Sequence, residues 1–391
     1  MPQSMDHMLS EEHQALVGAV RDFTREVVAP VSATHDEAHS FPYEVVSQMA
    51  GMGLFGLPFP EEHGGQGGDY FALCLALEEL AKVDQSVAIT LEAGVSLGAM
   101  PIYRFGTPEQ KERWLPELTR GERLAGFGLT ESEAGSDAGG TRTRAVLEDG
   151  EWVIDGTKEF ITNSGTDITS LVTVTAVTGE RTLGDGSVKK EISTILVPTD
   201  TPGFTAEPAY DKVGWNASDT HPLTLRNVRV PEENLLGERG RGYANFLGIL
   251  DEGRIAIAAL ATGAAQGCVD ESVRYAQERE TFGAPIGSNQ AISFKIARMQ
   301  ARAHSARLAY YDAAARMLAG KPFKTEAAIA KLIAGEAAMD NARDATQVFG
   351  GYGFINEFVV ARHYRDSKIL EVGEGTTEVQ LMLIARSLGL D

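Results

Sequence analysis

A glutamate between two glycines near the C-terminal end of the chain has the residue type needed for acid–base chemistry. It is Glu374, in residues 373–377 (GEGTT), which open a predicted helix over residues 377–388. Glycine lets a backbone approach a ligand closely, and the N–H groups at a helix start favour a polar or anionic ligand. In a dry site Glu374 could act as a general base. The segment is also compatible with an ordinary helix N-terminus, where the helix dipole favours a carboxylate.

Two further segments combine small, hydroxyl and aromatic residues. Residues 126–137 (GFGLTESEAGSD) can present N–H and O–H groups to a phosphate or to the polar edge of a ring. In residues 156–163 (GTKEFITN), Phe160 and Thr162 fall on one face of a predicted strand, so the ring could stack on a ligand while the hydroxyl bonds its edge. The first segment is also compatible with a surface loop, and the second with a core Phe and a turn Thr.

Two segments of the C-terminal half could contact a phosphate. Residues 279–283 (RETFG) begin with Arg279, whose guanidinium suits a pyrophosphate. Residues 347–353 (QVFGGYG) place glycines where a second backbone could approach a ligand. The glycines at 237, 240 and 242 are not surrounded by a βαβ unit, so a Rossmann site is unsupported. The sequence shows no Walker loop, no Ser/His/Asp elbow and no metal-binding box.

The composition is typical of a globular protein of two or three domains. The 391 residues are 43% hydrophobic and 23% charged. A net charge of −20 argues against nucleic acid or an anionic membrane as the main partner. Cys74 and Cys268 lie in apolar segments, so we expect buried reduced thiols. Residues 1–10 lack a secretion signal and no apolar run approaches the length of a membrane span, so we expect a cytoplasmic location.

The pattern of apolar residues predicts an α+β multidomain fold in three parts. Residues 1–123 form an all-α domain, in which Pro30 is expected to stop the helix over residues 10–29. A capping box, TPEQ at 107–110, starts the last helix of this part. Its other helices are predicted over residues 43–52, 69–83 and 86–105.

The middle part, residues 124–235, alternates short β-rich segments with Gly, Asp and Asn turns, as in a small β-barrel or sandwich. Its strands are predicted over residues 144–147, 152–154, 170–177, 192–197, 223–225 and 228–230. Residues 236–391 return to helical patterning and favour an antiparallel four-helix bundle. The long helices are predicted over residues 242–279, around the stripe from 292 to 317, and over 325–349.

Taken together and in this order, the segments resemble the acyl-CoA dehydrogenase family over nearly the whole chain. The resemblance depends on FGLTESEAGSD (127–137), EFITN (159–163), LDEGR (250–254), RETFG (279–283), QVFGGYG (347–353) and GEGTTEVQ (373–380). It implies an N-terminal helical domain, a middle β-domain and a C-terminal helical bundle. It also implies a non-covalently bound FAD and a homotetramer.

The resemblance implies that Glu374 is the catalytic base. It would take the α-proton of an acyl-CoA thioester while the β-hydrogen leaves as hydride to flavin N5, giving the trans-2-enoyl-CoA. Proton and hydride then leave from opposite faces of the Cα–Cβ bond. The thioester oxygen gains charge and needs fixed donors, which in the family are the backbone N–H of the base and a ribityl hydroxyl. Electrons would pass to electron-transferring flavoprotein.

The resemblance also implies the binding residues. Those matching flavin contacts are Phe127, Leu129, Thr130, Ser136, Phe160, Thr162, Thr376 and Glu378. Those matching adenosine and pyrophosphate contacts, some of them from a neighbouring subunit, are Arg279, Thr281, Phe282, Gln290, Gln347, Gly350 and Gly351. Those matching substrate contacts are Ser136, Asp251, Arg254, Gly373, Gly375 and Arg386.

Four positions bear on specificity. Gly373 stands where many members have Tyr, which should widen the acyl pocket, and Gly253 stands where some members hold the base, which leaves Glu374 as the candidate. Phe160 replaces a Trp that straight-chain members often have beside the flavin. Glu92 resembles a pocket-floor residue of medium-chain members, and residues 87–90 supply no cation for a glutaryl-type substrate.

Two alternatives to an acyl-CoA dehydrogenase stay open. An acyl-CoA or nitroalkane-type oxidase would use oxygen as its electron acceptor. A CoA- or flavin-binding scaffold without catalysis is disfavoured by the presence of Glu374, because an inactive relative would be expected to lose the base.

Overall fold

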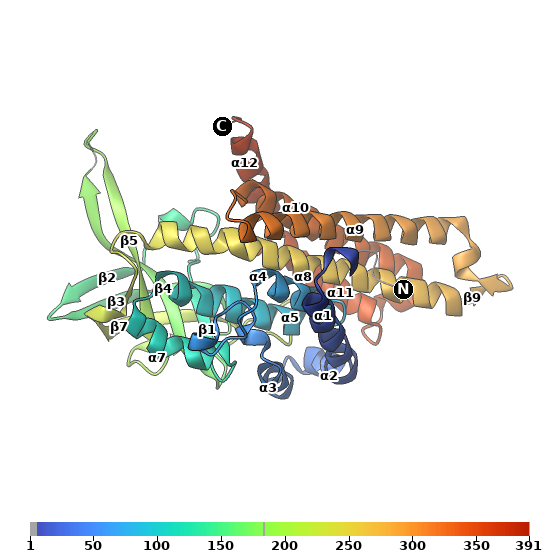
Figure 1. The fold of residues 1–391 in the computed structure, drawn as a ribbon, viewed down its shortest axis with the longest axis horizontal. Helices are drawn as coiled ribbons and strands as arrows, with labels where there is room; N and C mark the ends of the chain where they lie inside the picture. The colour runs from blue at the N-terminus through green and yellow to red at the C-terminus, as the bar shows by residue number, and fades with distance from the viewer. Residues whose placement is uncertain (1–5, 183, 391) are drawn as a thin grey trace.

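The computed structural model describes residues 6–182 and 184–390. The first five residues of the segment expected to lack a secretion signal, together with Leu183 and Asp391, lie outside this description. Figure 1 shows a sheet at one end of the long axis, blue helices below the middle, and long yellow-to-red helices that reach the opposite end. The predicted order of helices, sheet and helices is confirmed.

The N-terminal part is helical throughout, but Pro30 does not stop the first helix as predicted. A π turn over Thr24–Val28 leads directly into the next helix, and Pro30 occupies its first turn, where a missing N–H is tolerated. The elements are η1 (Asp6–Met8), α1 (Glu11–Phe23), η2 (Thr24–Val28), α2 (Ala29–Ala38), α3 (Tyr43–Gly51), η3 (Leu54–Gly56), η4 (Glu61–His63), α4 (Tyr70–Ala81), α5 (Gln85–Glu92), η5 (Ala93–Ala99), α6 (Met100–Phe105) and α7 (Pro108–Thr119).

The run through α5, η5 and α6 corrects the prediction that no apolar segment approaches a membrane span. Gln85–Phe105 has 21 residues and a mean hydropathy of 1.3, which suffices by length and composition alone. In this fold 89% of its apolar window is buried inside the protein, as in a core helix. The capping box at the start of α7 is confirmed, because the Thr107 hydroxyl accepts from Gln110 N and Gln110 Oε1 accepts from Thr107 N.

The middle part is one sheet in the order β6-β7-β3-β2-β4-β5-β8, and β1 pairs in parallel with β4. The strand β1 was not predicted. Residues 223–225 and 228–230 belong to one strand rather than two, because Asn227 adopts a left-handed conformation (φ 48°) that the strand accommodates. The strands are β1 (Leu124–Gly128), β2 (Arg144–Glu148), β3 (Glu151–Thr162), β4 (Thr169–Thr182), β5 (Val188–Pro198), β6 (Phe204–Ala206), β7 (Thr220–Pro231) and β8 (Leu235–Leu236).

The C-terminal part is built on one long central helix, α8, as predicted. A Cβ added at Gly263 or Gly267 would lie about 2 Å from a carbonyl oxygen of Glu78 or Lys82, so glycine is required where α8 meets α4. The elements are η7 (Glu232–Asn234), α8 (Gly242–Glu278), β9 (Glu280–Thr281), β10 (Ala284–Pro285), η8 (Ile286–Ser288), α9 (Gln290–Leu318), α10 (Lys324–Phe349), η9 (Gly350–Phe354), α11 (Val359–Ser367), η10 (Lys368–Glu371) and α12 (Thr377–Ser387).

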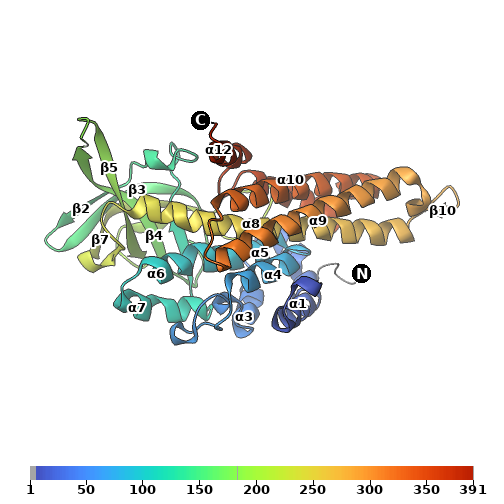
Figure 2. The same ribbon diagram turned by 45° about the horizontal axis from the view of Figure 1, so that its top comes forward.

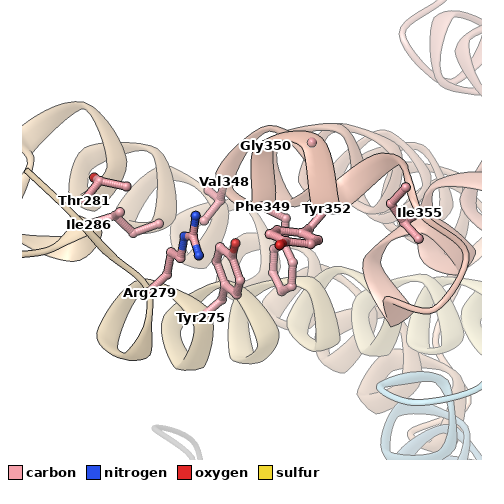
Figure 3. A pocket seen from close by; sticks show the side chains of 10 residues that line it. Tyr275, Arg279, Thr281, Ile286, Val348, Phe349, Gly350, Tyr352 and Ile355 are labelled. Atoms are coloured by element: carbon pink, nitrogen blue, oxygen red, sulfur yellow. The ribbon is translucent and has the colours of Figure 1, made fainter.

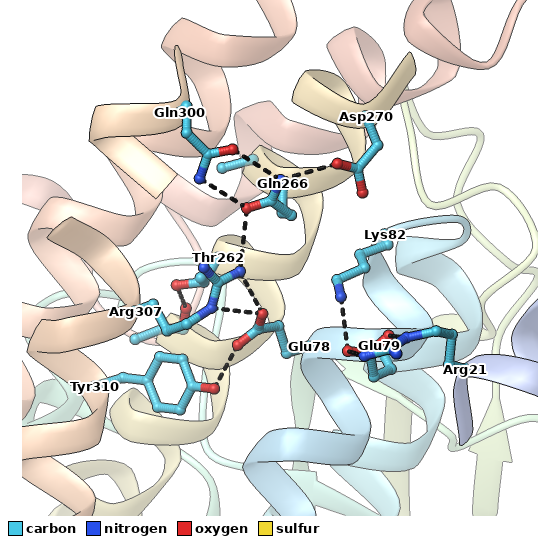
Figure 4. A network of polar contacts seen from close by, with 12 residues as sticks. Arg21, Glu78, Glu79, Lys82, Thr262, Gln266, Asp270, Gln300, Arg307 and Tyr310 are labelled. Carbon is cyan, nitrogen blue, oxygen red and sulfur yellow. Dashed lines mark hydrogen bonds and ion pairs between the residues drawn. The ribbon is translucent and has the colours of Figure 1, made fainter. Parts of the chain in front are cut away.

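A buried polar network joins the N-terminal helices to the C-terminal ones (Figure 4). Arg307 of α9 donates to Glu78 Oε1 of α4 from Nε at 2.8 Å and from Nη2 at 2.6 Å. The hydroxyl of Tyr310 donates to the other Glu78 oxygen, and Gln266 of α8 accepts from Arg307 at 3.2 Å. Because these buried charges are paired and hydrogen-bonded, the network fixes α4 against α8 and α9. Cys74 and Cys268 are buried free thiols nearby, as predicted.

The last helix, α12, projects from one side of the long helices in both Figure 1 and Figure 2. The C-terminal part therefore has α8, α9 and α10 side by side, the short α11, and a projecting α12. Several apolar side chains of this region remain exposed in the single chain: Leu381, Met382, Leu388 and Leu390.

Candidate active site

The turn that carries Glu374 connects η10 to α12. The hydroxyl of Thr376 accepts from Val379 N at 3.3 Å and so caps α12, which confirms the predicted helix start. Glu374 and Gly375 have φ values of 52° and 96°, in the left-handed region. A non-glycine residue there carries strain that the surroundings must hold in place. Glu374 therefore projects from a strained turn just before the helix.

The carboxyl group of Glu374 packs against the backbone of α8 at Gly253. A Cβ added at Gly253 would lie 2.7 Å from Glu374 Oε2 and 3.9 Å from Glu92 Oε1. Across residues 6–182 and 184–390, Oε2 is buried without a hydrogen-bond partner, and no acceptor is found for the Glu374 N–H. Glu374 as a whole is half-buried, so the base candidate keeps one buried oxygen and one N–H without a partner among the described residues.

Burial raises the pKa of Glu374 to about 7, because a carboxylate without water is destabilised relative to the acid. The positive charges of the Lys331 ammonium and the Arg254 guanidinium act against this rise. A carboxyl with a pKa near neutrality can both accept and hold a proton under physiological conditions. This is the property that a general base needs.

Glu92 of α5 is a titratable neighbour of the Glu374 carboxyl, and both lie beside Gly253. It is fully buried, and neither oxygen has a hydrogen-bond partner among the described residues. Burial first, and then the charge of Glu374, raise the pKa of Glu92 well above its usual range. Two carboxyls that share a site do not readily ionise together. Glu92 therefore stays neutral when Glu374 is ionised.

Two buried cations complete the surroundings of Glu374. Arg254 is 4% exposed and forms an ion pair with Asp251, one turn earlier on α8. Lys331 of α10 is 1% exposed, and its Nζ donates to Gly375 O at 2.7 Å. Arg254 and Asp251 were predicted from the sequence and Lys331 was not. The alanines that flank Lys331 in residues 327–334 were the one signal of a buried helix face.

The predicted flavin contacts of the middle part divide into buried and accessible side chains. Phe127 and Leu129 are 9% and 8% exposed, and the Phe127 ring stacks on Phe246 at 3.8 Å. Both side chains belong to the core, so their backbone is the part that could meet a ligand. Thr130 accepts from Glu159 N at 2.9 Å through its carbonyl, which ties this segment to β3.

Phe160 has an accessible ring near the end of β3. It is 64% exposed and adopts φ 62°, where the register with β7 shifts between Lys158 and Ile161. Its ring lies 5.2 Å from that of Tyr210. The core-Phe alternative is therefore wrong for Phe160, whereas Ile161 of the same strand is 2% exposed and takes the core position.

A buried ion pair holds the loop that contains Ser136. Lys158 Nζ of β3 lies 2.8 Å from Glu131 Oε1 and also donates to Leu129 O at 3.2 Å. Glu131 accepts from Arg142 N at 2.6 Å across the same loop. Ser136 itself is exposed. Neither member of this pair was predicted from the sequence, because a Lys on a strand and a Glu in a loop usually face solvent.

Part of the predicted phosphate-binding set lines a cavity of about 490 Å³ at the far end of α8 (Figure 3). The Arg279 guanidinium lies 5.7 Å from the centre of the Tyr352 ring, and Tyr275 stacks on Phe349 at 4.0 Å. Of the predicted set, the structure brings together Arg279, Thr281, Gly350 and Gly351. The side chains of Phe282, Gln290 and Gln347 are exposed and do not line this cavity.

This cavity is far from Glu374 within one chain. Arg254, beside the base, and Arg279, at the cavity, are roughly 25 residues apart on α8, a rise of about 37 Å at 1.5 Å per residue. The structure therefore does not bring the two halves of the predicted cofactor set together in a single chain. On α12, Glu378 is exposed in the first turn and Arg386 is exposed in the last turn.

Comparison with known families places the whole chain in one of them. The family description "Acyl-CoA dehydrogenase, N-terminal domain" matches residues 10–122, "middle domain" matches residues 126–228, and "C-terminal domain" matches residues 240–389. The chain belongs to the acyl-CoA dehydrogenase family. The family consists of oxidoreductases, so the resemblance and fold class predicted from the sequence are confirmed.

Relatives within the acyl-CoA dehydrogenase family match over full length. "Probable acyl-CoA dehydrogenase YngJ" of Bacillus subtilis is 47% identical over 98% of this chain and 100% of its own. "Acyl-CoA dehydrogenase, short-chain specific" of Megasphaera elsdenii is 42% identical over the same shares. A solved structure described as "Electron transferring flavoprotein of Acidaminococcus fermentans: Towards a mechanism of flavin-based electron bifurcation" has a TM-score of 0.93 at 39% identity, covering 98% of this chain and 99% of that one.

The chemistry of several predicted contact residues is compatible with a flavin dinucleotide. The exposed Phe160 ring and the nearby Thr162 offer a flat apolar surface and a hydroxyl. Arg279 offers a cation suited to a pyrophosphate. A Cβ added at Gly350 or Gly351 would meet nothing within 4 Å, so their backbone is open to a ligand.

Proposed function

We propose that the chain is an FAD-dependent acyl-CoA dehydrogenase with Glu374 as its general base. The observation that carries this proposal is the enclosed carboxyl of Glu374, with an unpartnered Oε2 among the described residues and a pKa raised to about 7. In the reaction the α C–H bond breaks, its proton passes to Glu374, and the electron pair helps form the Cα–Cβ double bond of the trans-2-enoyl-CoA. Bound FAD supplies the acceptor for the β-hydride.

The chain's own residues would bind and polarise the thioester. The available N–H of Glu374 can donate to the thioester oxygen, where negative charge develops as the α-proton leaves. The substrate contacts proposed around this group are Ser136, Asp251, Arg254, Gly373, Gly375 and Arg386. Because a wide Gly373 turn and the neutral carboxyl of Glu92 border the base, we assign the enzyme to short acyl chains, with branched ones accepted. The names of its short-chain relatives support this assignment.

The proposed cofactor contacts require more than one copy of the chain. Thr130, Phe160 and Thr162 belong to the middle part of the chain, whereas Arg279 and its cavity lie about 37 Å along α8 from Arg254. A neighbouring copy can supply the second group, and exposed apolar residues such as Phe282 and Leu381 offer it a contact surface. We therefore propose a homotetramer with three domains per chain: 1–123, 124–235 and 236–391.

Electron-transferring flavoprotein is the acceptor that we propose for the reduced enzyme, in a cytoplasmic setting. A similar chain occurs in a structure described by that name. An oxidase with the same fold would differ in one respect that can be measured, because it would continue to turn over in air without an added acceptor.

The test is anaerobic reduction of the bound flavin by a panel of thioesters. The purified protein is loaded with FAD and mixed with butanoyl-, isobutanoyl-, isovaleryl-, octanoyl- or palmitoyl-CoA, and the visible flavin band is followed. We expect rapid bleaching by the short chains and none by the same chains in the Glu374→Gln variant. A flavin that no thioester bleaches would overturn the proposal, and so would a Glu374→Gln variant that keeps the wild-type rate.

A further inference from the structure

Among the described residues near Glu374, Lys331 is a buried cation that neither the motifs nor the proposed reaction accounts for. It lies on α10 and is 1% exposed, and lysine is almost never buried unless it is paired. Its Nζ donates to Gly375 O at 2.7 Å, the carbonyl of the residue that follows the base. The ammonium has thus been withdrawn from water and placed against the turn of the active site.

The Gly375 carbonyl receives a second hydrogen bond. Gln380 Nε2, from the first turns of α12, donates to the same oxygen at 2.8 Å. The turn needs such support because Glu374 and Gly375 both have left-handed φ values, 52° and 96°. Two donors on one carbonyl fix the peptide that follows Gly375, and with it the turn from which the Glu374 carboxyl projects.

The charge of Lys331 is compensated less than that of the other cation in the site. Arg254 has an ion pair with Asp251, whereas no carboxylate lies within 4 Å of Lys331 Nζ in the described chain. Burial lowers the pKa of Lys331 to about 8, and the charge of Glu374 opposes this. The charged and titratable groups that face the turn are Glu92 on α5, Arg254 on α8, Lys331 on α10, and Glu371 and Glu378 on either side of it.

We propose that Lys331 is the positioning residue for the base. It holds the Glu374–Gly375 turn through the Gly375 carbonyl, and it supplies buried positive charge that favours the ionised form of the Glu374 carboxyl. This inference rests on the proposed role of Glu374. The geometric part is shared with Gln380, but the electrostatic part belongs to Lys331.

Four variants separate position from charge. Lys331→Met removes both the donor and the charge, Lys331→Gln keeps a neutral donor, and Lys331→Arg keeps a charged one. Gln380→Leu removes the other donor and leaves the charge in place. Melting temperature and FAD content are recorded for each variant, so that one that fails to fold is recognised. If Lys331→Met does not fold, the effect of charge is measured by comparing Lys331→Gln with Lys331→Arg.

Two readouts report the ionisation of Glu374. The first is an infrared titration of the apoprotein's protonated carboxyl band, taken as the difference from the same protein with Glu374→Gln. The second is the pH profile of anaerobic flavin reduction by butanoyl-CoA. In Lys331→Met and Lys331→Gln we expect both midpoints to rise by about one pH unit or more. In Lys331→Arg the midpoint should stay close to that of the wild type. In Gln380→Leu the midpoint should also stay, and the plateau rate should fall.

An unchanged midpoint in both Lys331→Met and Lys331→Gln overturns the proposal and leaves Lys331 a structural residue. This outcome is distinguishable from failure of the proposed function. If no thioester reduces the wild-type flavin, the dehydrogenase proposal fails, while the infrared titration still measures the effect of Lys331 on Glu374.

Discussion

The carboxyl of Glu374 lies so close to the backbone of Gly253 that a Cβ atom at residue 253 would come within 2.7 Å of Glu374 Oε2. The two residues are far apart in sequence, one on α8 and one in the turn before α12. Their contact means that the base candidate rests directly on a helix backbone. The space beside residue 253, where a larger side chain would have its Cβ, is here occupied by the Glu374 carboxyl.

A methyl group at Gly253 should therefore displace the Glu374 carboxyl. The contact is with the end of a flexible side chain, so we expect Gly253→Ala to fold and to bind FAD, but to lose about tenfold in the rate of flavin reduction, because a misplacement of about 1 Å costs catalysis heavily. Stopped-flow absorbance measures the rate. Gly248→Ala is the matched control, since it lies on the same helix with nothing within 4 Å of its added Cβ. Equal rates in the two variants would contradict this account.

The rate of flavin reduction should depend on pH through Glu374. Burial raises the pKa of its carboxyl from 4.5 to about 7, and only the ionised form can accept the α-proton. The rate should therefore rise with pH and reach half of its plateau near pH 7. Single-turnover measurements with butanoyl-CoA, from about two pH units below neutrality to about two above it, give this curve. A rate that is flat below pH 6 would argue against Glu374 as the base.

Glu92 should make the stability of the protein depend on pH in a defined direction. Burial raises its pKa well above the ordinary value of 4.5, so the unfolded chain releases a proton that the folded chain keeps. Stability from this group is complete below pH 4.5 and is lost as pH rises towards its folded pKa. Glu92→Gln has no titrating carboxyl at this position, so it should not lose stability as the pH rises. We expect its melting temperature to exceed that of the wild type at pH 8 and to match it at pH 4.5, while the exposed Glu112→Gln changes neither.

The motifs predicted Glu374 and its helix start, but not the residues that surround the base. The pairing of Glu374 with Gly253 and Arg254 follows from segments recognised in the sequence. Lys331 was not predicted, because its helix carries charges on several faces. Periodicity alone does not show which of its lysines is buried. Only the packing of α10 against the Glu374 turn reveals it.

The fold shows a similar division between local and tertiary information. The capping box at Thr107 and the long helix α8 depend on local sequence and were predicted closely. Pro30 was predicted to end a helix because the π turn before it is not encoded by residue types that stand out. The two predicted segments of β7 are one strand, because the left-handed Asn227 lies at a register shift and its N–H donates to Asp155 Oδ1 of β3 at 2.8 Å.

The buried pair of Lys158 and Glu131 should stabilise the loop before β2. The Lys158 charge lowers the pKa of Glu131 to about 2 even though burial acts in the opposite direction. Lys158→Met leaves a buried carboxylate without its cation, which costs on the order of 3–5 kcal/mol. We expect a lower denaturant midpoint and weaker FAD retention. Most of this loss should be restored by adding Glu131→Gln, and the exposed Lys189→Met should have no effect. A double variant no better than the single one would show that Lys158 acts through its packing.

The turn at Gly373 should set the width of the acyl site. A Cβ added there would lie 3.4 Å or more from its nearest neighbours, the Ile369 carbonyl and side chain, so the position has room for a side chain. A Gly373→Tyr variant would place a ring beside the base. We expect it to keep the rate with butanoyl-CoA within a few-fold and to lose about tenfold in kcat/KM for isobutanoyl-CoA, a penalty of the size set by one branch methyl in a filled pocket. Gly373→Ala adds one carbon, so its kcat/KM for isobutanoyl-CoA should lie between those of the wild type and Gly373→Tyr. If both variants treat straight and branched chains alike, the acyl group does not pass Gly373, and the width of the site is set by Glu92 and the α8 backbone.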